Sequence, residues 1–203
     1  PQKQIMPQAW QTYSYDEVKD AVYAHTGEVL DALASQGTLP DMVQVGNEIS
    51  NGMLWPYGSG RHSFEGLCGL VAEGVRAVRE YAPDATIMLH VALGGQMEES
   101  MRFFDVMAEY GIEYDVIGQS YYPEWHGTLQ ELESNLQAMA LRYAKPLIVV
   151  EYRDHYKDID RIVRALPNGL GRGTFIWEAT SPDWGRLFDK DGASLPVLDD
   201  YNR

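Results

Sequence analysis

The sequence is short of cysteine, of positive charge and of long apolar runs. Its single cysteine, Cys68, excludes an internal disulfide framework and a thiolate-rich metal site. The chain has sixteen Lys and Arg against thirty Asp and Glu, which gives a formal net charge of −14. We therefore expect it to bind neither nucleic acid nor an anionic membrane surface. No apolar run approaches the ~18 residues that span a bilayer. The chain begins at Pro1 without a charged and then apolar leader, so we expect a processed chain or a piece of a longer one.

The sequence does contain a regular alternation of short apolar runs and longer amphipathic runs. Hydrophobic residues make up 45% of the 203 residues, which is enough for the packed core of about one domain. Helical periodicity on the first amphipathic run places His25 and Val29 on its apolar face, His25 as a core or interface histidine. The predicted strands are residues 42–46, 86–91, 114–118, 146–150 and 173–177. The predicted helices are residues 14–36, 63–81, 98–110, 129–143 and 158–166.

Near-continuous apolar strands separated by helices predict an α/β fold whose parallel sheet is covered on both faces. An open doubly wound sheet and a (β/α)₈ TIM barrel both fit this pattern. Strand ends at about residues 47, 90, 119, 150 and 177 give repeats close to the ~31 residues per unit of a barrel. No Gly-x-Gly-x-x-Gly follows a strand, so the usual dinucleotide-binding signal is missing. The barrel is therefore the favoured architecture.

Polar or aromatic side chains follow all five predicted strands. Glu48 follows the first strand and Glu151 the fourth. Barrel enzymes carry their catalytic residues at the carboxyl ends of the strands, so we expect these two carboxyl groups to converge at the barrel mouth. Paired carboxylates suit glycoside hydrolysis, because one protonates the leaving oxygen while the other attacks the anomeric carbon or activates water. The structural alternative at either position is a solvated or helix-capping glutamate.

Aromatic and polar residues gather in the same segments after the strands, and aromatic rings bind the flat C–H faces of sugars. Trp55 lies in a loop rich in Gly and Pro, where we expect it to be exposed. Asn47 either donates to a sugar hydroxyl or closes its turn, and His90 and His126 orient a glutamate or a sugar hydroxyl rather than hold a metal. The candidate substrate-binding residues are Asn47, Trp55, His90, Tyr121, Tyr122, Trp125, His126 and Trp177, and Trp184 belongs to the same aromatic group.

No cofactor is expected from the sequence. Asp183, Asp189 and Asp191 share one loop near the C-terminus, but they lack the carboxylate density of an EF-hand. Calcium is therefore not favoured there.

Longer segments carry a resemblance that goes beyond single residues. Residues 43–56 read VQVGNEISNGMLWP, residues 117–127 read IGQSYYPEWHG, and residues 187–192 read LFDKDG. They resemble the acid/base motif, the sixth-strand motif and the C-terminal end of glycoside hydrolase family 53, the endo-β-1,4-galactanases. Residues 1–10 resemble the stretch after that family's third strand, so the resemblance spans essentially the whole chain.

The resemblance implies a retaining mechanism on a barrel of glycosidase clan A, with the β-1,4-galactan side chains of pectin as the polysaccharide substrate. It implies that Glu48 is the acid/base, that Glu151 is the nucleophile and that Asn47 bonds the sugar 2-hydroxyl. It also implies that Tyr121 lies near the nucleophile and that Trp177 forms the floor of the cleaved sugar's subsite. For the full-length precursor it implies a secreted or periplasmic location.

On this interpretation, residues 1–203 are the C-terminal part of the catalytic domain, with strands four to eight and without strands one to three. Five strands cannot close an eight-stranded barrel, so we expect a second copy or an N-terminal segment to cover two open strand edges. Some bacterial members of the family hold a calcium ion in the loops after the last two strands, and these loops are short here. Two alternatives stay open, namely a non-catalytic carbohydrate-binding fragment and another clan-A specificity such as a β-glucanase or a mannanase.

Overall fold

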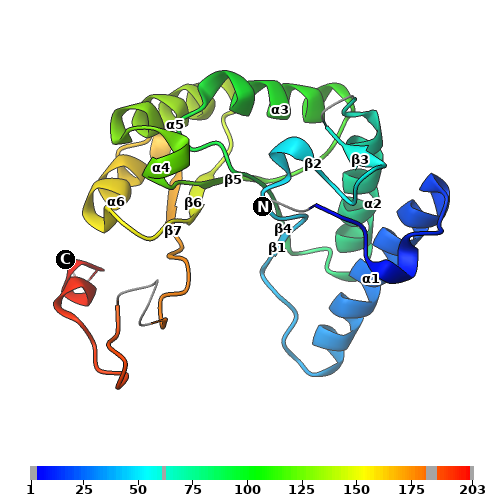
Figure 1. Cartoon of the computed structure of the whole chain (residues 1–203), viewed down its shortest axis with the longest axis horizontal. Coiled ribbons are helices and arrows are strands. Elements are labelled where there is room, and N and C mark those ends of the chain that lie inside the picture. The colour runs from blue at the N-terminus through cyan, green and yellow to red at the C-terminus, as the bar shows by residue number, and fades with distance from the viewer. Residues whose placement is uncertain (1–3, 61–62, 182–186, 202–203) are drawn as a thin grey trace. The chain divides into compact units, whose positions relative to one another are not determined.

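The computed structural model describes residues 4–60, 63–181 and 187–201 and divides into two compact units (Figure 1). The first unit comprises residues 1–90 and 101–116, and the second comprises residues 91–100 and 117–203. Helix α3 (Met97–Glu109) contributes residues to both units. Among the described residues, no helix is both long enough and apolar enough to cross a membrane.

In the first unit, two parallel strands are followed by helices. Strand β1 (Met42–Gln44) pairs with β4 (Thr86–Val91), and Met42 lies opposite Thr86. Helices α1 (Tyr15–Ser35) and α2 (Glu65–Tyr81) pack against each other (Figure 1). Between β1 and α2, the chain forms the 3-10 turn η2 (Ile49–Asn51) and a small antiparallel hairpin of β2 (Gly52–Met53) and β3 (Gly58–Ser59). A further 3-10 turn, η1 (Gln8–Trp10), precedes α1.

The core of the first unit explains the amphipathic pattern of α2. Its buried side chains include Leu67, Leu70 and Val71, while the interior positions of β4, such as Ile87 and Leu89, are also buried. Burial of these apolar surfaces is the main stabilising contribution to such a unit. Cys68 lies in the same core, and burial raises the pKa of its thiol to about 11. A thiol so protonated is a poor nucleophile at neutral pH, so Cys68 serves as a small core residue.

The second unit repeats the same scheme with three parallel strands. Strands β5 (Val116–Ser120), β6 (Leu147–Glu151) and β7 (Gly171–Thr174) pair in that order. Helices α4 (Pro123–His126), α5 (Leu129–Tyr143) and α6 (Tyr156–Arg164) follow β5 and β6, and the 3-10 turns η3 (Pro167–Gly169) and η4 (Pro196–Tyr201) lie before and after β7. Apolar side chains of α5 and α6, among them Leu136 and Ile162, are buried.

The alternation of parallel strands and helices agrees with the sequence prediction, and two strands are shifted. Residues 114–118 are predicted as the third strand, whereas β5 spans Val116–Ser120. Residues 173–177 are predicted as the last strand, whereas β7 spans Gly171–Thr174. The shift of β7 has a packing reason, because a Cβ atom on Gly171 would lie 1.7 Å from the carbonyl oxygen of Val163 in α6. Glycine therefore lets β7 approach the end of α6 closely, and Phe175 beyond the strand is exposed.

The prediction for the apolar face of α1 is wrong in part. His25 is exposed, with its ring edge-on to Trp10 at 6.3 Å between centroids, and Val29 is 45% exposed. The residues that α1 buries are Val18, Val22, Gly27 and Leu30. Contact with α2 buries only this narrow stripe of α1, whereas the sequence periodicity predicts a wider apolar face that includes His25 and Val29.

Candidate active site

The loop after β1 holds Glu48 in an unusual backbone conformation. Glu48 has a φ of 48° and a ψ of 49°, in the left-handed region that residues other than glycine seldom adopt. Gly46 before it has a φ of 79°. These two positive φ values, two positions apart, turn the chain sharply at the end of β1. Such strain persists where surrounding contacts hold it, and it is concentrated at functional sites.

Side-chain amides hold this turn. The Gln4 Nε2 donates to the carbonyl oxygen of Asn47 at 2.9 Å, and the Gln44 Nε2 donates to the carbonyl oxygen of Gly46 at 2.9 Å and to the Asn47 Oδ1 at 3.2 Å. The Asn47 side chain is exposed, so its position is set by neighbours while its amide group remains accessible. Asn47 therefore belongs to the turn, which is one of the two alternatives considered from the sequence, and its bond to a sugar hydroxyl stays a prediction.

His90, at the end of β4, is 1% exposed and lies under the same turn. Its Nδ1 is 3.1 Å from the Asn47 Oδ1 and 3.4 Å from the Glu48 backbone nitrogen. A protonated Nδ1 donates to Asn47, whereas an unprotonated Nδ1 accepts from the Glu48 N–H. In either form His90 contacts the turn that carries Glu48.

Trp55 lies half-buried in the hairpin loop that follows Glu48. Its indole N–H donates to the carbonyl oxygen of Asn51 at 3.2 Å, and its backbone N–H donates to the carbonyl oxygen of Gln4 at 2.7 Å. The Trp55–Pro56 peptide bond is cis. The expected exposure of Trp55 is thus partial, because the ring is fixed against the loop instead of projecting freely.

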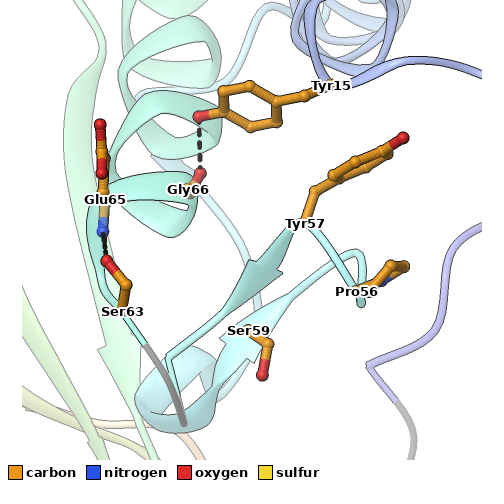
Figure 2. A pocket seen from close by; sticks show the side chains of 7 residues that line it. All are labelled: Tyr15, Pro56, Tyr57, Ser59, Ser63, Glu65 and Gly66. Atoms are coloured by element: carbon orange, nitrogen blue, oxygen red, sulfur yellow. Dashed lines mark hydrogen bonds between the residues drawn. The ribbon is translucent and has the colours of Figure 1, made fainter.

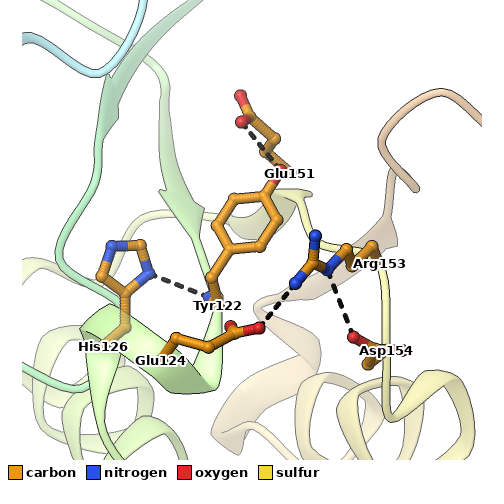
Figure 3. Close-up of polar contacts among 6 residues, drawn as sticks. All are labelled: Tyr122, Glu124, His126, Glu151, Arg153 and Asp154. Carbon is orange, nitrogen blue, oxygen red and sulfur yellow. Dashed lines mark hydrogen bonds and ion pairs between the residues drawn. The ribbon is translucent and has the colours of Figure 1, made fainter. Parts of the chain in front are cut away.

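In the second unit, Glu151 is the last residue of β6 and Tyr122 follows β5 (Figure 3). The Tyr122 hydroxyl donates to the Glu151 Oε1 at 2.9 Å, and the Tyr122 ring is almost fully buried. The backbone N–H of Tyr121 donates to the Glu151 carbonyl oxygen at 2.8 Å, which extends the strand pairing to the edge of the sheet. The carboxylate of Glu151 is therefore oriented by a phenol donor.

The short helix α4 completes this part of the site. The His126 Nδ1 accepts from the Tyr122 backbone N–H at 3.0 Å, so the ring of His126 secures the first turn of α4 and is itself buried. Trp125 is 67% exposed, and its ring lies 5.5 Å from that of Tyr122. Arg153, just after β6, forms ion pairs with Glu124 at 2.5 Å and with Asp154 at 3.3 Å (Figure 3).

The expectation that Tyr121 lies beside Glu151 is corrected by the structure. Tyr121 is 1% exposed, its hydroxyl donates to the carbonyl oxygen of Gly127 at 2.9 Å, and burial raises the pKa of its phenol. Successive side chains at a strand end point to opposite sides. Tyr122 therefore reaches Glu151, and Tyr121 packs into the interior next to Gly94.

The remaining sequence candidates lie near the C-terminus. Trp177 is 44% exposed, and its backbone N–H donates to the Tyr152 carbonyl oxygen at 2.8 Å. Trp184 and Asp183 lie outside the described residues. The Asp189 Oδ1 accepts from the backbone N–H groups of Asp191 and Ala193, and Asp191 pairs with Lys190 at 3.2 Å. Because these oxygens serve a turn and an ammonium group, the described part of this loop does not fit a calcium site.

Sequence reasoning missed Gln4, which holds the turn that carries Glu48, and Arg153, which pairs with Glu124 of α4. Gln4 and Arg153 carry no pattern that marks them, because their partners lie 43 and 29 residues away along the chain. The positive φ of Glu48 also has no signature beyond the glycine two positions earlier.

Known proteins share this sequence and fold. The sequence model described as Glycosyl hydrolase family 53 matches residues 1–162. An uncharacterized protein of Niallia circulans is 39% identical over 91% of this chain and 60% of its own length. An endo-beta-1,4-galactanase of Bacillus subtilis is 36% identical over 74% of this chain and 34% of its own length.

The solved structure of the GH53 catalytic domain of Ignisphaera aggregans matches with a TM-score of 0.90 and 30% identity, over 99% of this chain and 69% of that one. This likeness confirms the predicted barrel-type α/β fold, of which the described residues contain five parallel strands. The chain spans 60% or less of the length of the two curated relatives above. Since the family match covers most of the chain, this protein belongs to glycosyl hydrolase family 53.

Proposed function

We propose that this chain carries the two catalytic carboxylates of a retaining endo-glycosidase that hydrolyses β-1,4-galactan. Membership of the family and the name of the Bacillus subtilis relative support the reaction and the substrate. The observation that carries the assignment of roles is the hydrogen bond from the Tyr122 hydroxyl to the Glu151 Oε1. A donor fixed to one carboxylate oxygen favours the ionised form, which is the form of a nucleophile.

In this proposal the reaction runs in two displacements. A carboxylate oxygen of Glu151 attacks the anomeric carbon, and the bond to the leaving sugar's oxygen breaks as Glu48 gives that oxygen a proton. Water then attacks the glycosyl-enzyme ester while Glu48 takes a proton from it, which restores both carboxyl groups and releases the sugar with its original configuration. For this route we expect the two carboxyl groups about 5 Å apart, the spacing typical of retaining enzymes.

Neighbouring groups would bind the sugar. The exposed amide of Asn47, held by Gln44 and His90, suits a hydrogen bond to the hydroxyl next to the anomeric carbon. Exposed indole faces on Trp125 and Trp177 suit the C–H faces of neighbouring sugar units. These contacts grow stronger as the ring flattens toward the transition state, which is where binding energy raises the rate.

Two further proposals concern the whole protein. Within the described part of the chain, β1 is paired only with β4 and β7 only with β6, so each has an open edge. We propose that strands from outside this chain or from a second copy cover these edges. Because a polysaccharide is too large to enter a cell, we also propose that the full-length protein acts after secretion or in the periplasm.

The test replaces Glu151 and follows the release of reducing sugar from galactan. Glu151→Gln is expected to lower the rate by roughly 10³-fold or more, because no covalent intermediate can form. Added azide should restore turnover of an activated aryl galactoside by Glu151→Gly and yield a galactosyl azide of inverted configuration. Glu178→Gln, which changes another glutamate located after a strand, is the control and should keep full activity. Full activity in Glu151→Gln would reject the nucleophile assignment, and a panel with glucan and mannan checks the substrate.

A further inference from the structure

A pocket separate from the loop end that carries Glu48 lies in the first unit, between the start of α1 and the β2–β3 hairpin (Figure 2). Its volume is about 360 Å³, at the lower end of the roughly 300–1,000 Å³ usual for small-molecule sites. Tyr15 and Tyr57 form its aromatic sides, and Pro56, Ser59, Ser63 and Glu65 also line it. Nothing in the proposed reaction uses these side chains.

The two tyrosine rings are held in place by their hydroxyl groups. The Tyr15 hydroxyl donates to the Gly66 carbonyl oxygen at 2.9 Å, and the Tyr57 hydroxyl donates to the Tyr13 carbonyl oxygen at 2.9 Å. The ring centroids are 5.7 Å apart, with an angle of 50° between the ring planes. Because the hydroxyls are already bonded, the ring faces are what a ligand would contact. Rings fixed in advance lose little entropy when they bind.

Glycine keeps the base of the pocket open. A Cβ atom on Gly66 would lie 2.1 Å from the carbonyl oxygen of Tyr57, so only glycine lets the hairpin loop lie against the first turn of α2. At the same turn, the Ser63 Oγ accepts from the Glu65 backbone N–H at 3.1 Å (Figure 2). One N–H of the helix start is therefore bonded within the protein.

The lining identifies the chemistry of the ligand. Two aromatic faces and a proline ring bind the C–H face of a pyranose, while the hydroxyls of Ser59 and Ser63 and the Glu65 carboxylate can bond its hydroxyl groups. The Glu65 carboxylate and the net charge of −14 both repel an acidic ligand. A neutral sugar fits these conditions, and a uronic acid does not.

We propose that this pocket is an accessory binding site for a neutral β-linked galactosyl unit of the polysaccharide. The identity of the sugar rests on the proposed function, whereas the pocket's preference for a neutral pyranose rests on its own lining. Tyr57 belongs to the same loop as Glu48 and Trp55, so a chain held at Tyr57 is tethered to the segment that bears the acid/base. The pocket thus lowers KM for polymeric galactan and leaves short substrates unaffected.

The experiment uses the full chain with Glu151→Gln, so that the probe, β-1,4-galactotetraose, is not consumed. Amide resonances of Ser59, Glu65 and Gly66 are followed during the titration. We expect saturable shifts at these amides and none with tetragalacturonate. Tyr57→Ala should raise the Kd read at these amides roughly tenfold, because it removes one ring face. Tyr57→Phe keeps the ring and should leave this Kd unchanged. Tyr110→Ala, an exposed tyrosine of the same unit outside the pocket, is the matched control.

The outcomes separate this proposal from the proposed function. Amides that do not shift in the otherwise wild-type background, or a Kd equal in Tyr57→Ala and Tyr110→Ala, would overturn the accessory site. If galactan is hydrolysed while these amides stay unchanged, only the accessory site fails. If the amides shift while the wild-type chain releases no sugar and Glu151→Gln changes nothing, the accessory site stands and the hydrolase assignment fails.

Discussion

The turn that carries Glu48 and the strand end that carries Glu151 are stabilised by different chemistry. Around Glu48, the contacts described above come from the neutral amides of Gln4 and Gln44 and from His90. Around Glu151, they include a phenol donor, and the charged pair of Arg153 and Glu124 follows two residues later. The contacts given for Glu48 hold its backbone turn, whereas the phenol of Tyr122 donates to the carboxylate of Glu151 itself, and such a donor favours the ionised form.

The backbone conformations of the two glutamates also differ. Glu48 has a left-handed backbone conformation and lies outside the helices and strands. Glu151 is the last residue of the paired strand β6, and Ser120 of β5 lies opposite it. A turn can present its side chain at an angle that a strand does not allow, but it needs contacts from distant parts of the chain to hold it. The comparison predicts that replacing each glutamate changes the rate in a way that depends differently on the leaving group. It also predicts that the rate responds differently to the loss of side chains near each glutamate.

The largest contrast is expected when each glutamate is replaced and the leaving group is varied. Glu48→Gln should slow galactan hydrolysis by roughly 10²–10⁴-fold, because general acid catalysis is lost. With a dinitrophenyl galactoside, whose leaving group needs no proton, the first step in Glu48→Gln should recover and the glycosyl-enzyme should accumulate as a burst. Glu151→Gln should show no burst with either substrate. A burst in Glu151→Gln, and none in Glu48→Gln, would exchange the two roles.

A smaller effect is expected at the tyrosine beside Glu151. Tyr122→Phe removes the donor to the Glu151 Oε1, and hydrogen bonds to charged groups contribute about 1.5–3 kcal/mol. We therefore expect kcat to fall by roughly 10- to 100-fold, with little change in KM. Tyr121→Phe is the matched control, since its hydroxyl is bonded to a backbone carbonyl, and it should change stability but not kcat. Equal losses of kcat in both variants would mean that the hydroxyl of Tyr122 acts only through the fold.

Local patterns made much of the fold predictable. Helix α5 has the predicted bounds, Leu129–Tyr143, because its periodicity is continuous and Thr128 and Glu131 mark its start. Strand β4 likewise matches its prediction, since six buried or half-buried residues form one run. Both signals are contained within the element itself. The bounds of β7 differ from the prediction because the close approach of Gly171 to Val163 of α6 is a packing contact between two elements, which the pattern of one element does not encode.

The candidate site was less predictable for the same reason. Both glutamates are marked by their position after a strand, a local feature, yet the choice between Tyr121 and Tyr122 depends on which side the chain turns after β5. The contact from Gln4 to Asn47 joins segments 43 residues apart, and no periodicity encodes it. Sequence reasoning therefore marks candidate reactive residues more readily than the residues that hold their segments in place.

Each of the two units contains a helix that begins with a capping box. Helix α1 begins with a capping box of Ser14 and Glu17, and α5 begins with one of Thr128 and Glu131. Ser14→Ala and Thr128→Ala should each lower the free energy of unfolding by about 1 kcal/mol. Hydrogen bonds from the cap residues lower the pKa values of Glu17 and Glu131. The part of this stability that depends on ionised Glu17 and Glu131 is therefore complete above the ordinary carboxyl pKa of 4.5. It is lost as the pH falls through the lower pKa values that these two groups have in the folded state.

Urea unfolding of both variants at pH 7 and pH 3 measures these effects. If the units unfold together, the two substitutions should shift the midpoint by similar amounts at pH 7, and both effects should shrink at pH 3. Two separate transitions, each moved by one substitution only, would show that the units unfold independently.

The smallest effect is expected for the ion pair that follows Glu151. The carboxylate of Glu124 is 47% exposed and the guanidinium of Arg153 is 25% exposed, so solvent screens their attraction. A hydrogen bond from its own backbone N–H lowers the pKa of Glu124 first, burial opposes this, and Arg153 lowers it further. A double-mutant cycle of Glu124→Gln and Arg153→Gln should give a coupling energy of about 0.5 kcal/mol at pH 7. Since the pKa of Glu124 is lowered, this coupling is complete above 4.5 and should vanish as the pH falls through the folded value. A coupling that persists at pH 3, or a loss of kcat in Arg153→Gln as large as in Tyr122→Phe, would mean that Arg153 acts on Glu151 itself and not only on α4.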